Sequence, residues 1–396
     1  MTRNSLPGRT DIQRPIIAAI GIVACNEEEA IGPMLESLFN QTYFQKVAEL
    51  ERRIQILVVT NGCTDRTVEV AQRVLQNMSS TLAIRDTFEW EVLNLKRRGK
   101  LNAWNEFVHK HSAREAEFLF LMDGDIVLAH PDTLWNMQCA LENNSKACVA
   151  TDQPMKDILG KERKSLKDRF SLATTQMNRT GKAQLTGQLY CIRTPVARNI
   201  FLPADLVACE DGFIKSLVCS YFLTREPSSE RLVQAQNASH IFEAYTTLPS
   251  IFRNQKRQMI GQTVVHILVD NFLQSLTLEQ KLNLAETIQD LEKNDPGWLK
   301  RLIAEHLVRV KHFWRLFPGI LTFRFERLAK LRGLKRLKHL PAASAGFLVT
   351  MIACWQAWRF LKRGSTDYWP DTKSPNLRNL NIPQGKARAA TAGATK

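Results

Sequence analysis

Two carboxylates one residue apart, Asp123 and Asp125, follow the apolar run 118–122, which is typical of a buried strand. Side chains placed in this way can both reach a divalent cation. Hard oxygen ligands suit Mg²⁺ or Mn²⁺, which also bind phosphate oxygens. The alternative is an ordinary turn at the strand end, because Asp and Gly are common turn residues. The apolar strand before the pair favours a metal site.

Three other polar clusters also come shortly after a predicted strand: Asn26 with Glu27, Asn61 with Asp65, and Lys100. Lys100 opens a helical pattern, where backbone N–H groups favour a diphosphate. Each cluster also has a structural alternative. These are a helix cap at Asn26, a tight turn after Asn61 and a solvated lysine at position 100.

Alternating strand and helix patterns connect these clusters. Apolar runs predict strands over 16–25, 54–60 and 118–122, a weaker pattern predicts one over 90–95, and helical patterns lie between them. Strands that alternate with helices indicate an α/β fold with a doubly wound, mostly parallel sheet. Ligands bind at the carboxyl ends of the strands in such sheets. We therefore expect the clusters to converge on one crevice.

In this order the clusters resemble the motifs of inverting glycosyltransferases of family 2, which have the GT-A fold. Two later segments fit the same family. Thr186-Gly187-Gln188 looks like its glycine segment near the acceptor, and Cys209-Glu210-Asp211 looks like its acidic catalytic-base motif. The resemblance covers roughly residues 16–262.

The resemblance implies a role for each candidate residue. On the donor side it implies nucleoside contacts for Asn26, Glu27 and Asn61, further donor contacts for Asp65, Lys100 and Asp123, and Mg²⁺ or Mn²⁺ binding at Asp123 and Asp125. On the acceptor side it implies Gly187, Gln188 and Arg257, with Asp211 as the general base and Glu210 as a rival base. A helix cap is the structural alternative for Asp211.

The sequence departs from the family pattern in two places. An acid often stands in the family where this chain has Thr60 and Asn61, so base recognition is expected to differ. Processive members carry Q-x-x-R-W, whereas residues 254–258 keep only Arg257. This departure favours the addition of a single sugar to an acceptor hydroxyl.

The positive charge of the chain is concentrated in its last quarter. From Arg301 onward there are 19 Lys and Arg residues against four acids, which accounts for the whole net charge of +15. The body is therefore not a basic nucleic-acid-binding surface. The eight cysteines form no C-x-x-C pair and several lie in apolar runs, which indicates a reducing compartment. The first 15 residues contain no secretory signal.

The segment 313–363 predicts membrane attachment. Residues 340–358 carry no charge, which meets the length rule for a span, and the basic, Leu-rich stretch 313–339 is typical of a helix on anionic lipid. Spanning and lying on the surface are both open, and a buried helix is the alternative. Residues 368–372 resemble a segment that follows the membrane helix in some family-2 enzymes. We expect the cytoplasmic face of the inner membrane, a nucleotide-sugar donor, and a lipid-linked or saccharide acceptor in bacterial-type polysaccharide or glycolipid synthesis.

The predicted organisation has five parts. They are a loose tail (1–14), a GT-A catalytic domain (15–262, with a nucleotide-sugar half to 150 and an acceptor half from 151), a helical region (263–312), the membrane-associated segment (313–363) and a second loose tail (364–396). A sugar-nucleotide nucleotidyltransferase is an alternative, although residues 23–30 lack its glycine-rich loop. A non-catalytic basic protein that binds membrane or RNA is another, although the aromatics of the basic tail adjoin an apolar run and are not interleaved with charge on a sheet. A dehydrogenase would need G-x-G-x-x-G.

Overall fold

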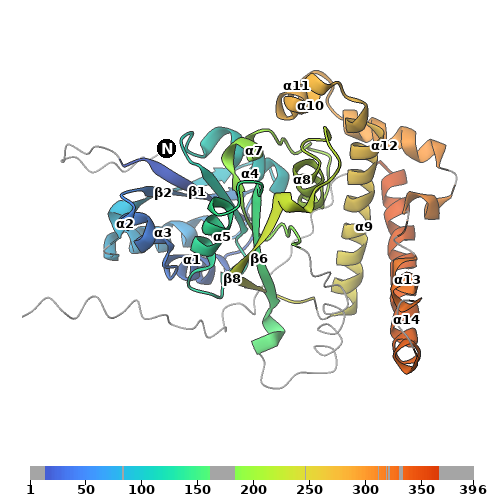
Figure 1. Ribbon diagram of the computed structural model, residues 1–396, viewed down its shortest axis with the longest axis horizontal. Coiled ribbons are helices and arrows are strands. Elements are labelled where there is room, and N and C mark those ends of the chain that lie inside the picture. Colours follow the sequence, from blue (N-terminus) through green and yellow to red (C-terminus); the bar gives the residue numbers. More distant parts are fainter. Residues whose placement is uncertain are drawn as a thin grey trace, which may run out of the picture.

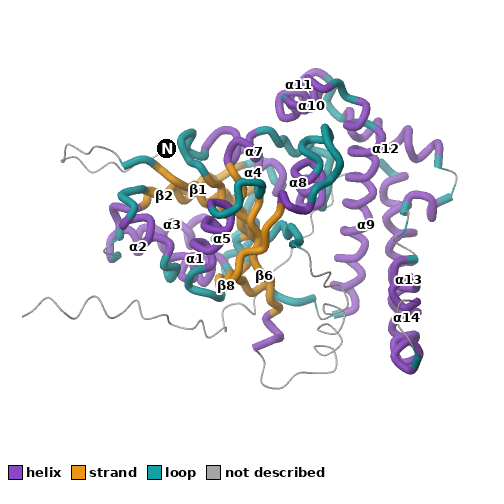
Figure 2. The backbone as a smooth tube through the Cα atoms, viewed as in Figure 1, coloured by secondary structure: helices purple, strands orange, loops and turns teal. Residues whose placement is uncertain are grey.

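A computed structural model describes residues 14–160 and 183–364, with gaps at 83, 246, 311, 318, 320–321 and 330–332 (Figure 1). One eight-stranded sheet runs through the described part in the order β3-β2-β1-β4-β7-β6-β8-β5. Its strands are drawn in orange in Figure 2. The strands are β1 (Ile16–Ala24), β2 (Arg53–Asn61), β3 (Phe88–Leu95), β4 (Phe118–Asp123), β5 (Ile126–Leu128), β6 (Val149–Lys156), β7 (Leu189–Arg193) and β8 (Leu232–Phe242).

The first four strands form the parallel part of the sheet. β1 lies between β2 and β4, and β3 is the outer neighbour of β2. These strands lie at the four positions where the sequence predicts them. The α/β class and the mostly parallel sheet are thus confirmed, and the carboxyl ends of β1, β2 and β4 lie at one edge of the sheet.

The second half of the sheet is mixed. β7 is antiparallel to both β4 and β6, β5 is antiparallel to β8, and β6 is parallel to β8. The sequence did not indicate these antiparallel pairs. Half of the residues in β6 and most of those in β8 are partly or fully exposed, so neither strand reads as a continuous apolar run.

Two hydrophobic cores cover the two faces of the sheet. Alternate side chains of β4 point to opposite faces, so Phe118 and Phe120 join one core while Leu119 and Leu121 join the other. The first core also takes in α1 (Ile31–Phe39), α2 (Tyr43–Glu49), α3 (Thr67–Thr81) and α5 (Thr133–Glu142). The second takes in α4 (Lys100–Glu106), α7 (Thr194–Arg198), α8 (Glu210–Cys219), α9 (Leu248–Asn271), α11 (Leu284–Asn294), α12 (Trp298–Arg309) and α14 (Leu334–Lys362).

The C-terminal helices extend the second core away from the sheet. α10 (Leu278–Leu282) and α11 follow α9, whose 24 residues run without a break through position 262, where the sequence places a domain boundary. α14 lies side by side with α9 (Figure 1). The expected tails, 1–14 and 364–396, and residues 368–372 lie outside the described residues except for Arg14 and Gly364.

The basic stretch 313–339 does not form one helix, so the prediction of a single basic helix over these residues is wrong. The structure has a short 3₁₀ turn (Phe313–Leu316), then α13 (Phe323–Ala329), and then the first turns of α14. Gly319 and Gly333 separate these pieces with φ of 73° and 58°. A backbone in this left-handed region cannot continue a right-handed helix.

Candidate active site

The end of β4 fits tightly against the end of β1. Asp123 pairs in register with Val23, and the Gly124 N–H donates to the Val23 carbonyl over 2.8 Å. A Cβ at position 124 would lie 2.8 Å from Ala24 Cβ, so only glycine fits this crossing. Gly124 thus allows the chain to turn at the strand end with Asp123 and Asp125 on either side of it.

Side-chain amides join the loops that follow β1 and β2. Asn26 Oδ1 accepts the Thr64 N–H at 2.8 Å, and Asn26 has φ of 57°, so it is not the helix cap that the alternative required. The Asn61 amide donates to the Ala24 carbonyl at 2.9 Å and accepts the Gly99 N–H at 3.0 Å. Asn61 is only 1% exposed, so the structure adds a loop-joining role to its predicted nucleoside contact.

Several carboxyl groups gather at this edge. Glu27 is 8% exposed, and burial together with Asp125, Asp123 and Asp65 raises its pKa to about 9. Asp65 also braces the loop, because its Oδ2 accepts the Glu28 N–H at 3.1 Å. The structure therefore groups the predicted donor-side acids, and the edge carries an excess of negative charge.

Lys100 connects the donor side to the acceptor side. Its Nζ lies 2.6 Å from Asp123 Oδ1 and 2.8 Å from Glu210 Oε1, and it donates to the Gly187 carbonyl at 2.8 Å. Burial acts against the ammonium, but the two carboxylates outweigh it and raise the pKa of Lys100. Three residues from separate parts of the chain are thus bound to one charged group.

The acceptor-side turn touches the same group. A Cβ at Gly187 would lie 2.6 Å from Glu210 Oε1, so the close approach of this turn to Glu210 requires glycine. The Gln188 carbonyl accepts the Asp123 N–H at 2.9 Å. Gly187 and Gln188 therefore lie beside both carboxylate motifs.

Glu210 and Asp211 form the first turn of α8. Its N-cap is Cys209, in the left-handed conformation with φ of 62°, so Asp211 does not cap the helix. Burial opposes the charge on Glu210, but Lys100 outweighs it and lowers the pKa of Glu210. Burial and the neighbouring Glu210 raise the pKa of Asp211, against the effects of Lys100 and Arg257. Of the two candidate bases, Glu210 is committed to an ion pair and Asp211 is the more basic.

One close contact behind this pair was not predicted from the sequence. A Cβ at Gly261 of α9 would lie 2.6 Å from Cys209 Sγ and 2.7 Å from the Ala208 carbonyl oxygen. α9 thus presses directly on the residues that lead into Glu210, and it carries Arg257 toward the site. A glycine inside a long helical pattern was the available signal, because it is costly there without a packing reason.

The protein side chains at this edge supply only part of the coordination that a divalent cation needs. Among the residues described, no three His, Cys, Asp or Glu side chains are arranged to hold a metal by themselves. Asp123 and Asp125 offer oxygen ligands in a region of excess negative charge. Mg²⁺-type sites commonly use one or two carboxylates and complete the coordination with water and substrate phosphates. The donor set therefore suits a metal that arrives with a phosphate-bearing ligand.

Comparison with known proteins finds a family match over part of the chain. Residues 19–195 match Glycosyl transferase family 2. No curated protein sequence matches the chain. Among solved structures, the chain is similar to a mannosyltransferase from Pyrobaculum calidifontis in complex with GDP-Man and Mn²⁺, with 15% identity, coverage of 88% of this chain and 86% of that chain, and a TM-score of 0.47.

A second similar structure is glucosyl-3-phosphoglycerate synthase from Mycobacterium tuberculosis in complex with Mn²⁺, UDP-glucose and phosphoglyceric acid. It has 14% identity, coverage of 63% of this chain and 79% of that chain, and a TM-score of 0.41. Both similarities are too distant to transfer the role of any residue. The matched segment contains most of β1, all of β2 and β4, and the donor-side acids that follow these strands, so this chain is a glycosyltransferase that carries a family 2 domain.

Proposed function

We propose that the chain transfers one sugar from a nucleotide-sugar donor to an acceptor hydroxyl with inversion at the anomeric carbon. This proposal rests on the position of Lys100, whose ammonium group forms ion pairs with both Asp123 on the donor side and Glu210 on the acceptor side. Donor and acceptor motifs that lie far apart in the sequence thereby meet in one site. The family match and this junction together support transfer between the two sides.

The donor side supplies the means to stabilise a departing nucleoside diphosphate. Asp123 and Asp125 would hold Mg²⁺ or Mn²⁺, which would neutralise charge that develops on the diphosphate. Lys100, held by two carboxylates and the Gly187 carbonyl, keeps its ammonium at the junction of the two sides. Asn26, Glu27 and Asp65 would receive the nucleoside, with Asn61 keeping their loops together.

The acceptor side supplies the base. Asp211 would take the proton of the acceptor hydroxyl as its oxygen attacks the anomeric carbon from the face opposite the diphosphate. The raised pKa of Asp211 suits proton abstraction, whereas the ion pair with Lys100 keeps Glu210 from that task. Arg257, on α9, is close enough to Glu210 and Asp211 to act on the pKa of both. The absence of the full Q-x-x-R-W motif at 254–258 favours a single addition.

A conservative substitution tests this assignment. Asp211→Asn keeps the shape and removes the basicity, so turnover should fall roughly 10²–10⁴-fold while donor affinity survives. Glu210→Gln should weaken the contact with Lys100 and lower stability more than Asp211→Asn does. Donor affinity, thermal unfolding and turnover measured on both variants separate these effects. Unchanged turnover in Asp211→Asn would remove Asp211 from the mechanism and leave Glu210 as the base.

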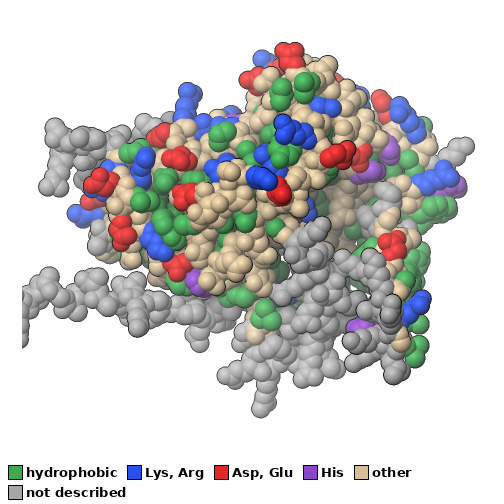
Figure 3. Space-filling model, in the orientation of Figure 1, with side chains coloured by type: hydrophobic (Ala, Val, Ile, Leu, Met, Phe, Trp, Pro, Cys, Tyr) green, Lys and Arg blue, Asp and Glu red, His purple; other side chains and the backbone are tan. Residues whose placement is uncertain are grey.

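We further propose that α14 attaches the enzyme to a membrane. Over the described residues, only the segment His339–Lys362 is long and apolar enough to cross a membrane by length and composition. One face of α14 is exposed and apolar, with Leu337 67%, Leu348 53% and Trp355 42% exposed. Hydrophobic and basic side chains lie together along this edge of the molecule (Figure 3). Such a surface is unusual unless it is covered.

The packing of α14 favours lying on the membrane over spanning it. Its opposite face, including Ala353, Ala357 and Leu361, belongs to the second core of the protein. α9 lies alongside and carries Arg253, Lys256 and Arg257, with Lys256 Nζ 5.1 Å from the Phe360 ring centroid. A spanning α14 would take these charges toward the bilayer interior, at several kcal/mol each.

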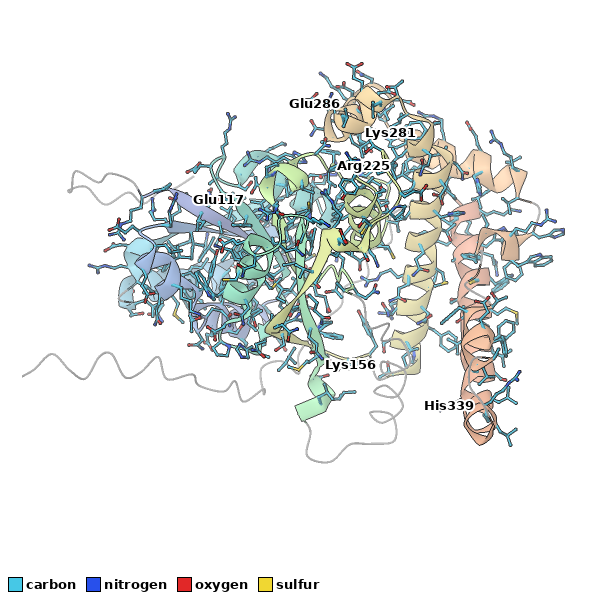
Figure 4. All side chains as sticks on the ribbon, viewed as in Figure 1. Glu117, Lys156, Arg225, Lys281, Glu286 and His339 are labelled. Atoms are coloured by element: carbon cyan, nitrogen blue, oxygen red, sulfur yellow. The ribbon has the colours of Figure 1, made fainter. Side chains whose placement is uncertain are left out.

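An interfacial helix agrees with the charge at the end of α14. The Arg359 guanidinium lies 4.8 Å from the Trp355 ring centroid, and Lys362 Nζ lies 4.5 Å from the Trp358 ring centroid. Aromatic rings with cations beside them suit the headgroup layer of an anionic membrane. His339 lies near the other end of α14, far from Lys281 of α10 and Glu286 of α11 (Figure 4).

We propose that the enzyme works at the cytoplasmic face of the inner membrane, with a lipid-linked or saccharide acceptor.

A further inference from the structure

A buried chain of polar side chains lies behind the acceptor-side turn. On β6, Asp152 Oδ2 lies 2.7 Å from His240 Nδ1 of β8, and His240 Nε2 lies 3.4 Å from Gln188 Oε1. The Asp152 and His240 side chains are fully buried, with 0% exposure each. The chain thus runs from the interior of the sheet to a residue of the candidate site.

This arrangement is costly for the fold. A buried carboxylate needs hydrogen-bond partners, yet Asp152 Oδ1 has none among the residues that the structure describes. Apolar side chains would fill the space between β6 and β8 at lower cost. A buried polar group that stability does not require calls for another reason for its presence.

Gln188 provides a reason for the buried pair, because both its backbone and its side chain are held in place. Its carbonyl accepts the Asp123 N–H at 2.9 Å, which fixes its backbone to the end of β4. Its side chain meets His240, whose ring is held in turn by Asp152. A histidine whose Nδ1 contacts a carboxylate has its ring orientation fixed, so Nε2 addresses Gln188 in one direction.

We propose that Asp152 and His240 are positioning residues that orient the Gln188 amide at the acceptor side of the site. This inference rests on the proposed glycosyl transfer, because it takes Gln188 as part of the acceptor surface. Asp152 and His240 touch neither substrate, and they act through Gln188 alone. Their removal therefore misplaces one amide without removing any donor ligand.

A second buried polar pair shows what a purely structural role looks like. Among the helices of the first hydrophobic core, the Tyr43 hydroxyl hydrogen-bonds the Gln138 side-chain carbonyl oxygen, and the Gln138 amide donates to Glu142 at 2.8 Å. None of these three residues contacts a candidate site residue through a hydrogen bond in the described structure. Tyr43→Phe is therefore a matched control that disturbs a buried polar pair away from the site.

A double-mutant cycle tests the proposal. The four full-length proteins are the wild type, Asp152→Asn with His240→Leu, Gln188→Met, and the triple variant. Paired removal of Asp152 and His240 avoids leaving a carboxylate buried alone. The readouts are kcat and KM for turnover of a nucleotide sugar with water as acceptor, donor affinity and thermal unfolding. The water reaction needs no knowledge of the natural acceptor.

We expect the Asp152→Asn, His240→Leu protein to lose up to about 10²-fold in kcat, since a small misplacement of a site group can cost this much. Donor affinity should stay unchanged, and the same changes should add no further loss in the Gln188→Met background. Tyr43→Phe should lower the unfolding temperature without lowering kcat. His240→Gln, which keeps a polar group toward Gln188, should restore part of the activity and serves if the leucine variant does not fold.

Two results would overturn the inference. One is unchanged kcat in the Asp152 and His240 variants, and the other is a loss that simply adds to that of Gln188→Met. Failure of the proposed transferase function is distinct, because it would show as no turnover and no donor binding in the wild-type protein itself.

Discussion

The two sides of the candidate site are built in different ways. The donor side comes from the ends of neighbouring parallel strands, and short loops joined by Asn26 and Asn61 hold it together. The acceptor side is assembled from the turn before β7, the start of α8 and the middle of α9. It meets the donor side through Lys100. A strand edge places its groups by register, whereas the acceptor side depends on a few long-range contacts. The acceptor side should therefore be more sensitive to substitutions that disturb packing, whereas the donor side should be sensitive mainly to loss of its own ligands.

The largest effect should come from the donor side itself, through its metal ligands. Asp125→Ala, or treatment of the wild type with EDTA, should reduce turnover by about 10³-fold or more, since a catalytic metal supplies several kcal/mol of charge stabilisation. Added Mn²⁺ or Mg²⁺ should restore the EDTA-treated wild type and not the variant. Full activity of Asp125→Ala in EDTA would show that the donor edge works without a metal.

The next effect tests the junction between the two sides. Lys100→Met leaves Asp123 and Glu210 buried without their shared partner, and removal of one member of a buried ion pair typically costs about 3–5 kcal/mol. Unfolding by urea should show this loss together with a loss of turnover. Lys46→Met is the matched control, because its ion pair with Asp132 at 3.0 Å is half-exposed and worth about 0–1 kcal/mol. Equal losses in the two variants would mean that Lys100 does not join the two sides.

A smaller effect tests the support behind the acceptor side. Gly261→Ala forces a Cβ to within 2.6 Å of Cys209 Sγ, and overpacking of this kind costs about 1–3 kcal/mol. Since the strain falls on the residue before Glu210, turnover should fall along with stability. Gly32→Ala in α1 is the control, because its new Cβ would meet nothing closer than 3.9 Å. If Gly261→Ala kept full turnover, α9 would not help to position the base.

The smallest effect on the site should come from the outward face of α14. Leu348→Ser, Ile352→Ser and Trp355→Ser together remove exposed apolar groups that touch no site residue, so stability and turnover on a water-soluble acceptor should hardly change. Binding to anionic lipid vesicles in a sedimentation assay should fall strongly. Ala353→Ser, on the buried face of the helix, is the control that should leave vesicle binding intact. A wild-type protein that ignores vesicles at low and high salt would rule out membrane attachment.

Much of the donor side was determined by the sequence alone. Apolar runs followed by polar residues mark parallel strands and their carboxyl ends, because a strand buried on both faces has to be continuously apolar. This local rule placed β1, β2 and β4 and the polar residues that follow them, whereas β3, with Glu and Asn among its residues and only two of eight buried, gave a weaker signal. It also explains why Asp123 and Asp125 could be selected before their neighbours were known.

The remainder was decided by tertiary structure. The register of β7, β6 and β8 depends on partners distant in sequence, so no local pattern announced the antiparallel pairs or the Asp152–His240 contact. Likewise, the sequence left α14 open between spanning a membrane, lying on one and packing as a buried helix. Our proposal that it lies on a membrane uses the packing of α14 against charged α9, which no local pattern shows. Hydrophobicity along a chain is a local property, whereas the depth that a helix can reach depends on what is packed beside it.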